Sequence, residues 1–175
     1  MVKRIYNILG GMQSYDGLLT SAGMKQLNGM LEDVGTVTTH LWHTYSDIYL
    51  NILDHQKDKI VIIGYSGGGA HATWIANGYR EVWRDGGIRT MRTTKPRIDL
   101  MILYDPSPQS GMMDLKGTNV KRCICYHNES PMMLGIGGGK ATGPMVEVVP
   151  IRIQHLLVQY SQELHNRTVE EIKKL

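Results

Sequence analysis

Residues 59–79 read KIVIIGYSGGGAHATWIANGY, and this stretch decides the fold. The apolar run at residues 60–63 has the length and composition of a buried strand. Residues 64–68, GYSGG, fit the pattern G-x-S-x-G, which requires a strand before it and a helix after it. A segment with the apolar spacing of a helix does follow. The stretch therefore predicts a strand, a sharp turn that carries Ser66, and a helix.

The two outer glycines of this motif have a mechanical reason. Gly64 and Gly68 each lie two residues from Ser66, at the points where the helix folds back over the strand. A side chain there would collide with the other element, and glycine avoids the collision. The Ser66 hydroxyl is then pushed above the edge of the sheet. We interpret Ser66 as a catalytic nucleophile; the alternative is a tight turn that binds phosphate or no ligand.

Strand-like and helix-like segments alternate along most of the chain. The expected strands cover residues 4–9, 36–44, 59–63, 97–104, 120–126 and 145–151. The expected helices cover residues 21–32, 47–55, 68–84 and 154–165, followed by a capping box at residues 168–171 that opens a last short turn. This alternation predicts an α/β fold: a three-layer α/β/α sandwich around a mostly parallel sheet of five to six strands.

The length and composition are those of one ordinary globular domain. The 175 residues are 42% hydrophobic and 20% charged, which allows a proper core but leaves little room for a second module. We expect a single domain over residues 1–175. The net charge of +3 is too small to argue for a nucleic-acid partner.

The two cysteines, Cys123 and Cys125, lie one residue apart in an apolar run. In a strand they point to opposite faces and cannot easily form a disulfide with each other. The apolar stretch after the basic start, residues 5–9, is too short for a signal sequence, and no run approaches the ~18 residues that cross a bilayer. We expect reduced thiols, no membrane span and a cytoplasmic location.

A serine hydroxyl becomes a good nucleophile only when a base removes its proton and a third group orients that base. In parallel sheets such groups gather at the carboxyl ends of strands. Asp105 follows the apolar run at residues 100–104, and His155 follows the last expected strand. The order Ser66, Asp105, His155 is the one typical of this motif. We therefore expect Asp105 as the acid and His155 as the base.

Other residues compete for these two roles. Glu129, after the fifth expected strand, is an alternative acid, and His127 at the end of that strand is an alternative base. Asp105 could instead hold its own backbone in an Asp-Pro turn, and His155 could cap the closing helix. We favour Asp105 because it stands at a strand end, and His155 as the base.

On residues 64–68, Asp105 with Pro106, and His155, the chain resembles the α/β-hydrolase superfamily over most of its length. It looks most like the small, lidless, lipase- and cutinase-like serine esterases. The resemblance implies a minimal α/β-hydrolase fold and transfer of an acyl group from an ester or thioester to water through an acyl-enzyme. Two features depart from the family pattern: many relatives carry the acid after a later strand, near Glu129 here, and the loop after the first strand lacks a His-Gly start.

Negative charge that develops on a substrate carbonyl needs preorganised hydrogen-bond donors, and one lost donor typically lowers the rate ~10²–10³-fold. The N–H of Gly67, directly after the nucleophile at a helix start, is one expected donor. The second should come from the loop after the first strand, which reads GGMQ at residues 10–13. We expect the N–H of Met12 or Gln13, since the glycines let this loop approach the substrate.

Three further features receive structural interpretations. His40, His43 and His71 lack the spacing and the carboxylate or thiolate neighbours of a zinc site, so no metal or other cofactor is expected. The glycine-rich segment at residues 135–143 lacks the details of a phosphate-binding loop and is expected to deliver the C-terminal histidine to the site. Residues 85–95 are expected to form a surface loop, and the cationic residues at 80–97, interrupted by acidic ones, indicate a solvated edge.

The sequence therefore predicts a serine hydrolase of carboxylic esters or thioesters with the triad Ser66, Asp105 and His155. No segment is large enough for a cap domain, so we expect an open site that accepts a bulky or polymeric ester. Amide or peptide hydrolysis uses the same groups and stays open. The other alternative is a binding module that holds a glycan, lipid or protein and does no chemistry. Such a module would place His155 too far from Ser66 for a hydrogen bond.

Overall fold

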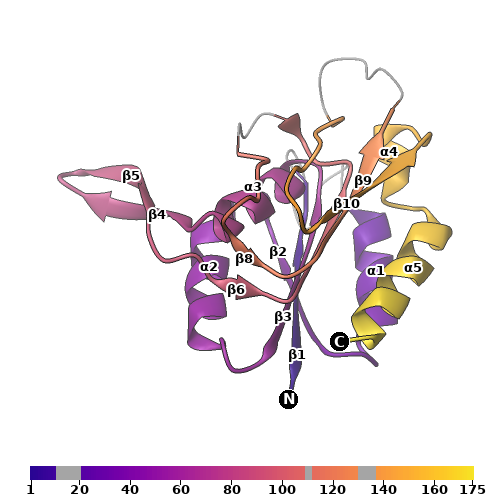
Figure 1. Ribbon diagram of the computed structural model, residues 1–175, viewed down its shortest axis with the longest axis horizontal. Coiled ribbons are helices and arrows are strands. Elements are labelled where there is room, and N and C mark those ends of the chain that lie inside the picture. Colours follow the sequence, from indigo (N-terminus) through magenta and orange to yellow (C-terminus); the bar gives the residue numbers. More distant parts are fainter. Residues whose placement is uncertain (11–20, 109–111, 130–136) are drawn as a thin grey trace.

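A six-stranded sheet forms the centre of the protein (Figure 1). The computed structural model describes residues 1–10, 21–108, 112–129 and 137–175. The strands of the sheet are β1 (Lys3–Ile8), β2 (Thr36–His40), β3 (Lys59–Tyr65), β7 (Leu100–Tyr104), β9 (Cys123–Asn128) and β10 (Val146–Ile151). They lie in the order β10-β9-β7-β3-β1-β2, and every neighbouring pair is parallel.

Helices cover both faces of this sheet. One face carries α1 (Ala22–Leu31) and α5 (Gln162–Lys173), and the other carries α2 (Tyr45–Asp54) and α3 (Gly67–Ala76) (Figure 1). Shorter helical elements are η1 (Trp42–Thr44) and α4 (His155–Val158). The predicted three-layer α/β/α sandwich with a mostly parallel sheet is confirmed.

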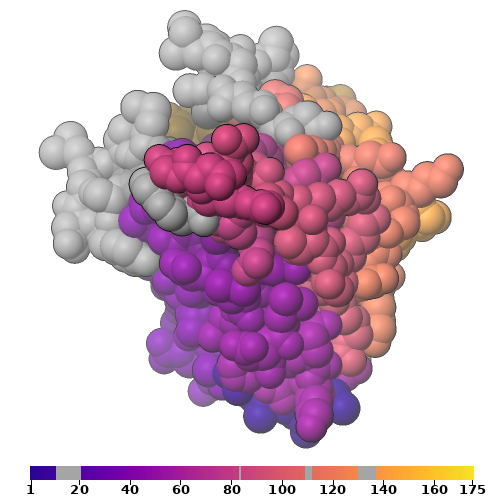
Figure 2. All heavy atoms as spheres, turned by 90° about the vertical axis from the view of Figure 1, so that its left-hand side faces the viewer, coloured from indigo at the N-terminus to yellow at the C-terminus, as the bar shows by residue number. Residues whose placement is uncertain are grey.

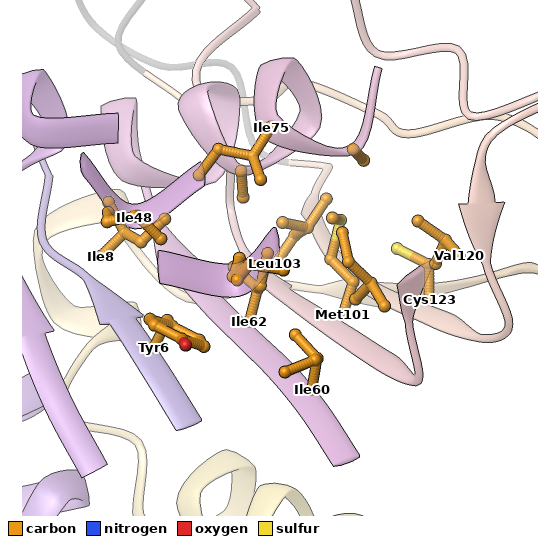
Figure 3. Close-up of a cluster of buried hydrophobic side chains, with 14 of the residues drawn as sticks. Tyr6, Ile8, Ile48, Ile60, Ile62, Ile75, Met101, Leu103, Val120 and Cys123 are labelled. Carbon is orange, nitrogen blue, oxygen red and sulfur yellow. The ribbon is translucent and has the colours of Figure 1, made fainter. Parts of the chain in front are cut away.

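Alternation along the strands builds two cores, one under each helical layer. Ile60 and Ile62 of β3 face α2 and α3, whereas Val61 and Ile63 face α1 and α5, because successive side chains of a strand point to opposite faces. Strand β3 is thus buried on both faces, which explains its unbroken apolar run. Figure 3 shows the first core, where side chains of several strands lie together under the helices. Its labelled members are Tyr6, Ile8, Ile48, Ile60, Ile62, Ile75, Met101, Leu103, Val120 and Cys123.

The strand order reverses between β1 and β3. From β1 the chain adds β2 on one side, and from β3 it adds β7, β9 and β10 on the other. Consequently α1, which follows β1, and α3, which follows β3, lie on opposite faces of the sheet. In open α/β sheets ligands bind at the carboxyl ends of the strands at such a switch point. The turn at Ser66 and the loop that begins after β1 both start there.

The expected helix over residues 68–84 is wrong in its second half. Helix α3 ends at Ala76, and Gly78 adopts a left-handed φ of 78°, which terminates a helix. The chain then forms two antiparallel strands, β4 (Tyr79–Arg84) and β5 (Gly87–Arg92). The apolar residues that fitted a helical spacing beyond Ala76, Tyr79 and Val82 among them, lie on β4 instead.

The resulting hairpin also replaces most of the surface loop expected over residues 85–95. Its turn is Asp85-Gly86, with φ of 52° and 76°, the left-handed pair that a tight two-residue hairpin turn requires. The hairpin projects sideways from the sandwich in Figure 1, and Figure 2 shows it in front of the body. The Glu81 N–H donates to Ser46 Oγ (2.7 Å) and fastens the hairpin to the start of α2.

Two expected strands are shorter than predicted. The strand expected over residues 97–104 is divided into β6 (Arg97–Ile98) and β7 by Asp99. The Asp99 carboxylate accepts a hydrogen bond from the Ile60 N–H (3.0 Å), and the Asp99 N–H donates to the Ile60 carbonyl (2.9 Å). β6 pairs instead with β8 (Asn119–Val120). The strand expected over residues 36–44 ends at His40, where the chain enters η1.

The C-terminal helix also differs from its prediction. The helix expected over residues 154–165 is divided into α4 and α5. The capping box expected at residues 168–171 is wrong, because α5 runs through these residues. Its N-cap is Ser161, whose Oγ accepts a hydrogen bond from the Leu164 N–H (3.4 Å).

Both cysteines are free and buried, as expected. Burial raises the pKa of the Cys123 and Cys125 thiols, which keeps them protonated and unreactive. Within the described ranges, no helix is both long enough and apolar enough to cross a membrane.

Candidate active site

Ser66 occupies a strained backbone position between β3 and α3. Its φ of 54° and ψ of −122° lie where non-glycine residues are rare, and such a conformation costs about 1–3 kcal/mol. Its N–H donates to the Tyr104 carbonyl (3.1 Å), and its own carbonyl accepts from the Ser107 N–H (2.9 Å) and the Ala70 N–H (3.2 Å). The strand, sharp turn and helix predicted around Ser66 are therefore present.

Glycines around Ser66 let three backbone segments approach one another closely. A Cβ atom on Gly64 would lie 2.7 Å from the Gly68 carbonyl oxygen, so Gly64 has the mechanical reason predicted for it. A Cβ atom on Gly68 would lie 2.2 Å from the Ile8 carbonyl oxygen, so the second glycine makes room for β1 rather than for β3. Gly10, in the loop after β1, is close enough that its Cβ would lie 3.1 Å from Ser66 Cβ.

Ser66, His155 and Asp105 meet at the carboxyl edge of the sheet. His155, the first residue of α4, places Nε2 2.9 Å from Ser66 Oγ and Nδ1 2.6 Å from Asp105 Oδ2. A carboxylate only accepts hydrogen bonds, so His155 donates from Nδ1, and Nε2 is left to accept the serine proton. The residues are buried, with 6% of Ser66, 3% of His155 and 0% of Asp105 exposed. The structure thus brings all three predicted residues together.

Asp105 is held as firmly as Ser66. It has a left-handed φ of 42°, and its N–H donates to the Tyr126 carbonyl (2.9 Å). Its second carboxylate oxygen, Oδ1, accepts hydrogen bonds from the backbone N–H groups of Gly138 (2.7 Å) and Asn128 (3.3 Å). Donors on both oxygens fix the carboxylate plane against the imidazole of His155. No sequence pattern indicates these backbone donors.

The two competing residues have other partners. Glu129, the alternative acid, is exposed, and its carboxylate lies 3.8 Å from the Arg152 guanidinium. His127, the alternative base, places Nδ1 3.3 Å from the Gly139 carbonyl oxygen. The geometry therefore favours Asp105 and His155 for these positions.

Tyr65, the residue before the serine, supports His155 and was not predicted. Its hydroxyl donates to the His155 carbonyl (3.0 Å), and its ring stacks on the imidazole with centroids 5.1 Å apart. Burial, together with the nearby Asp105 carboxylate, raises the pKa of Tyr65, so the phenol stays protonated and keeps donating. Tyr65 precedes Ser66 in the sequence, so its closeness to the site is expected. Its contact with His155, 90 positions later, has no sequence signature.

His71 supports the first turn of α3. Its Nδ1 lies 2.8 Å from the Gly67 carbonyl oxygen and donates to it. The rings of Trp42, Tyr45 and Trp74 lie 5.0–5.1 Å from the imidazole. Burial lowers the pKa of His71, so the ring is held neutral. These contacts agree with the structural role expected for this histidine.

The expected oxyanion donors are placed only in part. Gly67 is the first residue of α3, and the first N–H groups of a helix have no acceptor within the helix. They also carry the positive end of the helix dipole, which suits an anionic oxygen. Met12 and Gln13, the expected second donors, lie outside the described residues.

No protein-family model matches the chain, and no curated protein matches it. In the part of the chain that the structure describes, no three His, Cys, Asp or Glu side chains gather as metal ligands would. The geometry around Ser66 is the feature that bears on function. That geometry contains a nucleophile, a base within hydrogen-bond reach of it, and an acid that orients the base, which together can transfer an acyl group.

Proposed function

We propose that this protein is a serine hydrolase of the α/β-hydrolase type that cleaves carboxylic esters or thioesters. The observation that carries the proposal is the hydrogen-bond chain from Asp105 through His155 to Ser66, with distances of 2.6 and 2.9 Å. The same constellation serves acyl transfer on unrelated folds. A binding module without chemistry predicts a wide gap between His155 and Ser66, and the short distance argues against it.

In the proposed reaction, His155 Nε2 takes the Ser66 proton as Oγ attacks the carbonyl carbon. Asp105 stabilises the imidazolium through its hydrogen bond to Nδ1. The Gly67 N–H stabilises the oxyanion, with a second N–H predicted from Met12 or Gln13. His155 then protonates the leaving alcohol or thiol, which leaves an acyl group on Ser66. Water, deprotonated by His155, attacks this acyl group, releases the acid and restores the serine.

The surface of α4 supports a substrate with an apolar group. Directly after His155, Leu156 and Leu157 are 62% and 53% exposed, and Tyr160 is 45% exposed. Exposed apolar side chains next to a reactive group can serve as a binding surface for an apolar ligand. Because these side chains adjoin the proposed base, we place the apolar part of a bulky ester against α4.

A fluorophosphonate probe tests the proposed chemistry directly. The wild-type protein should be labelled covalently, and the Ser66→Ala and His155→Ala variants should lose labelling by at least about 10³-fold, since the triad acts as a unit. Ser107→Ala is the matched control, because it removes a nearby buried hydroxyl and keeps the N–H that holds Ser66. A folded wild type that stays unlabelled contradicts the proposal.

A series of p-nitrophenyl esters tests the substrate class. Leu156→Ser and Leu157→Ser should lower kcat/KM for long acyl chains by about tenfold while acetyl ester hydrolysis changes little, because a buried leucine contact stabilises by ~1.5–3 kcal/mol. Leu50→Ser on α2, where the leucine is 43% exposed and outside the site, is the control. A wild type restricted to acetyl esters would contradict the open apolar site. Matched anilides separate esterase from amidase activity.

A further inference from the structure

The backbone of Gly137 lies against the hydrogen bond between Asp105 and His155. A Cβ atom on Gly137 would lie 2.3 Å from His155 Nδ1 and 2.6 Å from Asp105 Oδ2. These are the two atoms that form the hydrogen bond. Gly137 itself is buried and has a left-handed φ of 92°. A residue with a side chain therefore cannot occupy this position without displacing the acid or the base.

The residues after Gly137 fasten this backbone to the acid. The Gly138 N–H donates to Asp105 Oδ1 (2.7 Å), and the Gly139 N–H donates to the Pro106 carbonyl (2.7 Å). The segment also has little freedom at Gly139, where a Cβ would lie 2.5 Å from the Pro106 carbonyl oxygen. Residues 137–139 thus lie directly on the strand end that carries Asp105, although they belong to the connection between β9 and β10.

We infer that Gly137 is a positioning residue for the proposed hydrolase: its bare backbone covers the Asp105–His155 hydrogen bond, excludes water from it and fixes the imidazole toward Ser66. The inference depends on the proposed function, since it concerns the orientation of the proposed base. Gly137 touches no reacting atom and acts only through Asp105 and His155. Its role follows from the absence of a side chain, because only glycine allows the main chain to come this close.

The physical benefit lies in the charge that develops on His155 during the reaction. When Nε2 takes the serine proton, the imidazolium is stabilised by the Asp105 carboxylate, and the interaction is stronger where water is excluded. A misplacement of about 1 Å in such a site can lower the rate about 100-fold. Displacing the pair should therefore lower kcat and change its pH dependence, with little effect on substrate binding.

Two alanine substitutions separate this role from backbone strain. Gly137→Ala and Gly86→Ala both place a side chain at a left-handed residue, with φ of 92° and 76°. At Gly86, in the hairpin turn, nothing lies within 4 Å of the added Cβ. The two variants share the strain, and only Gly137→Ala intrudes on the Asp105–His155 pair.

The measurement is ester hydrolysis and fluorophosphonate labelling across pH for both variants. We expect kcat of Gly137→Ala to fall about 100-fold with KM nearly unchanged, and the pH profile of kcat to differ from that of the wild type. Gly86→Ala should keep kcat within a few-fold and keep the wild-type pH profile. In proton NMR the far-downfield imidazole N–H signal of His155 should persist in Gly86→Ala and be lost or shifted in Gly137→Ala.

Equal kcat, pH profile and imidazole signal in the two variants would overturn the inference while leaving the hydrolase proposal intact. A wild type without labelling or turnover would instead defeat the proposed function, and the NMR comparison would still report on the position of Gly137. If Gly137→Ala does not fold, hydrogen exchange of the wild-type protein tests the inference instead. The Gly138 amide must exchange far more slowly than that of Gly86, the exposed glycine of the hairpin turn.

Discussion

Ser66 and Asp85 have almost the same φ, 54° and 52°, but for different reasons. Asp85 opens the two-residue hairpin turn and is followed by Gly86, and such a pair adopts left-handed conformations readily. At Ser66 the backbone hydrogen bonds to β7 and α3 and the close approach of Gly64 and Gly68 hold the residue in place. Local sequence thus sets one conformation, and tertiary packing sets the other.

The surroundings of the two residues differ in the same way. Ser66 is 6% exposed, whereas the Asp85 side chain is 73% exposed. A change near Ser66 meets backbone atoms at once, while a change near Asp85 extends into solvent. Strain at the candidate site is therefore imposed by the whole edge of the sheet and is not a property of five consecutive residues.

The largest expected effect on stability comes from Gly68→Ala. The added Cβ would lie 2.2 Å from the Ile8 carbonyl oxygen and 2.5 Å from that of Leu9, so α3 and β1 must separate. Overpacking of this kind against fixed backbone should lower the free energy of unfolding by at least about 3 kcal/mol. Urea unfolding measures this free energy. A loss below about 1 kcal/mol would show that the edge of the sheet accommodates an added side chain as easily as the hairpin does.

Tyr65→Phe should have an intermediate effect. It removes the hydroxyl that donates to the His155 carbonyl and leaves a buried acceptor without that partner, which costs about 1–3 kcal/mol. Because His155 is less firmly held, ester turnover should fall as well. The control in the hairpin is Tyr79→Phe, whose ring lies near the Arg92 guanidinium (5.9 Å) and should change stability by less than about 0.5 kcal/mol. If thermal unfolding shows the same loss of stability in both variants, the candidate site is not held more tightly than the hairpin.

Gly86→Ala should have a small effect. Nothing lies within 4 Å of the added Cβ, so only the left-handed φ of 76° is unfavourable, at about 1 kcal/mol. Ester turnover should match the wild type. A loss comparable with that of Gly68→Ala, measured in the same urea series, would mean that the hairpin is as tightly constrained as the edge of the sheet.

Mild acidification should destabilise the α/β/α sandwich before it affects the hairpin. Burial lowers the pKa of His165 below 6.5. At mildly acidic pH the unfolded chain therefore binds a proton at this histidine that the folded protein does not bind, and this favours unfolding. The stabilisation is complete above about pH 6.5 and is lost as the pH falls through the folded pKa. The hairpin at residues 79–92 contains no histidine.

Thermal unfolding between pH 7 and pH 5 checks this expectation, because the carboxylates titrate mostly below that window. His165→Leu should flatten the decrease of the melting temperature with falling pH. Exposed His43→Gln is the control and should leave the slope as in the wild type. An unchanged slope in His165→Leu would remove His165 as the cause.

The hairpin shows which local signals were misread. Asn77-Gly78 ends α3, and Asp85-Gly86 forms the turn, and both pairs are strong turn signals. The prediction interpreted the apolar spacing beyond Ala76 as helical, and it assigned Asp85-Gly86 to a surface loop. The two turn pairs therefore carried the signal for the hairpin, and the error was to extend the helix through the first of them.

Other features had no readable signal. Asp105 was predicted as the acid from its place at a strand end, but its φ of 42° and its donors Gly138 and Asn128 were not. Tyr65 was adjacent to the predicted nucleophile, yet its hydrogen bond to His155 joins residues far apart in the chain. These contacts depend on how β7, β9 and α4 converge, which no single segment encodes.

By itself the sequence determined the layered α/β architecture, the turn at Ser66 and the chain order of the three residues that meet there. Apolar periodicity and the spacing of glycines around a serine are local properties, so they can be read from neighbouring residues. The way Asp105 is held, and the lack of room for a side chain at Gly137, became visible in the folded chain alone. The physical reason is that these constraints come from backbone N–H groups and from unoccupied space, which nearly every residue type shares and which only folding places together.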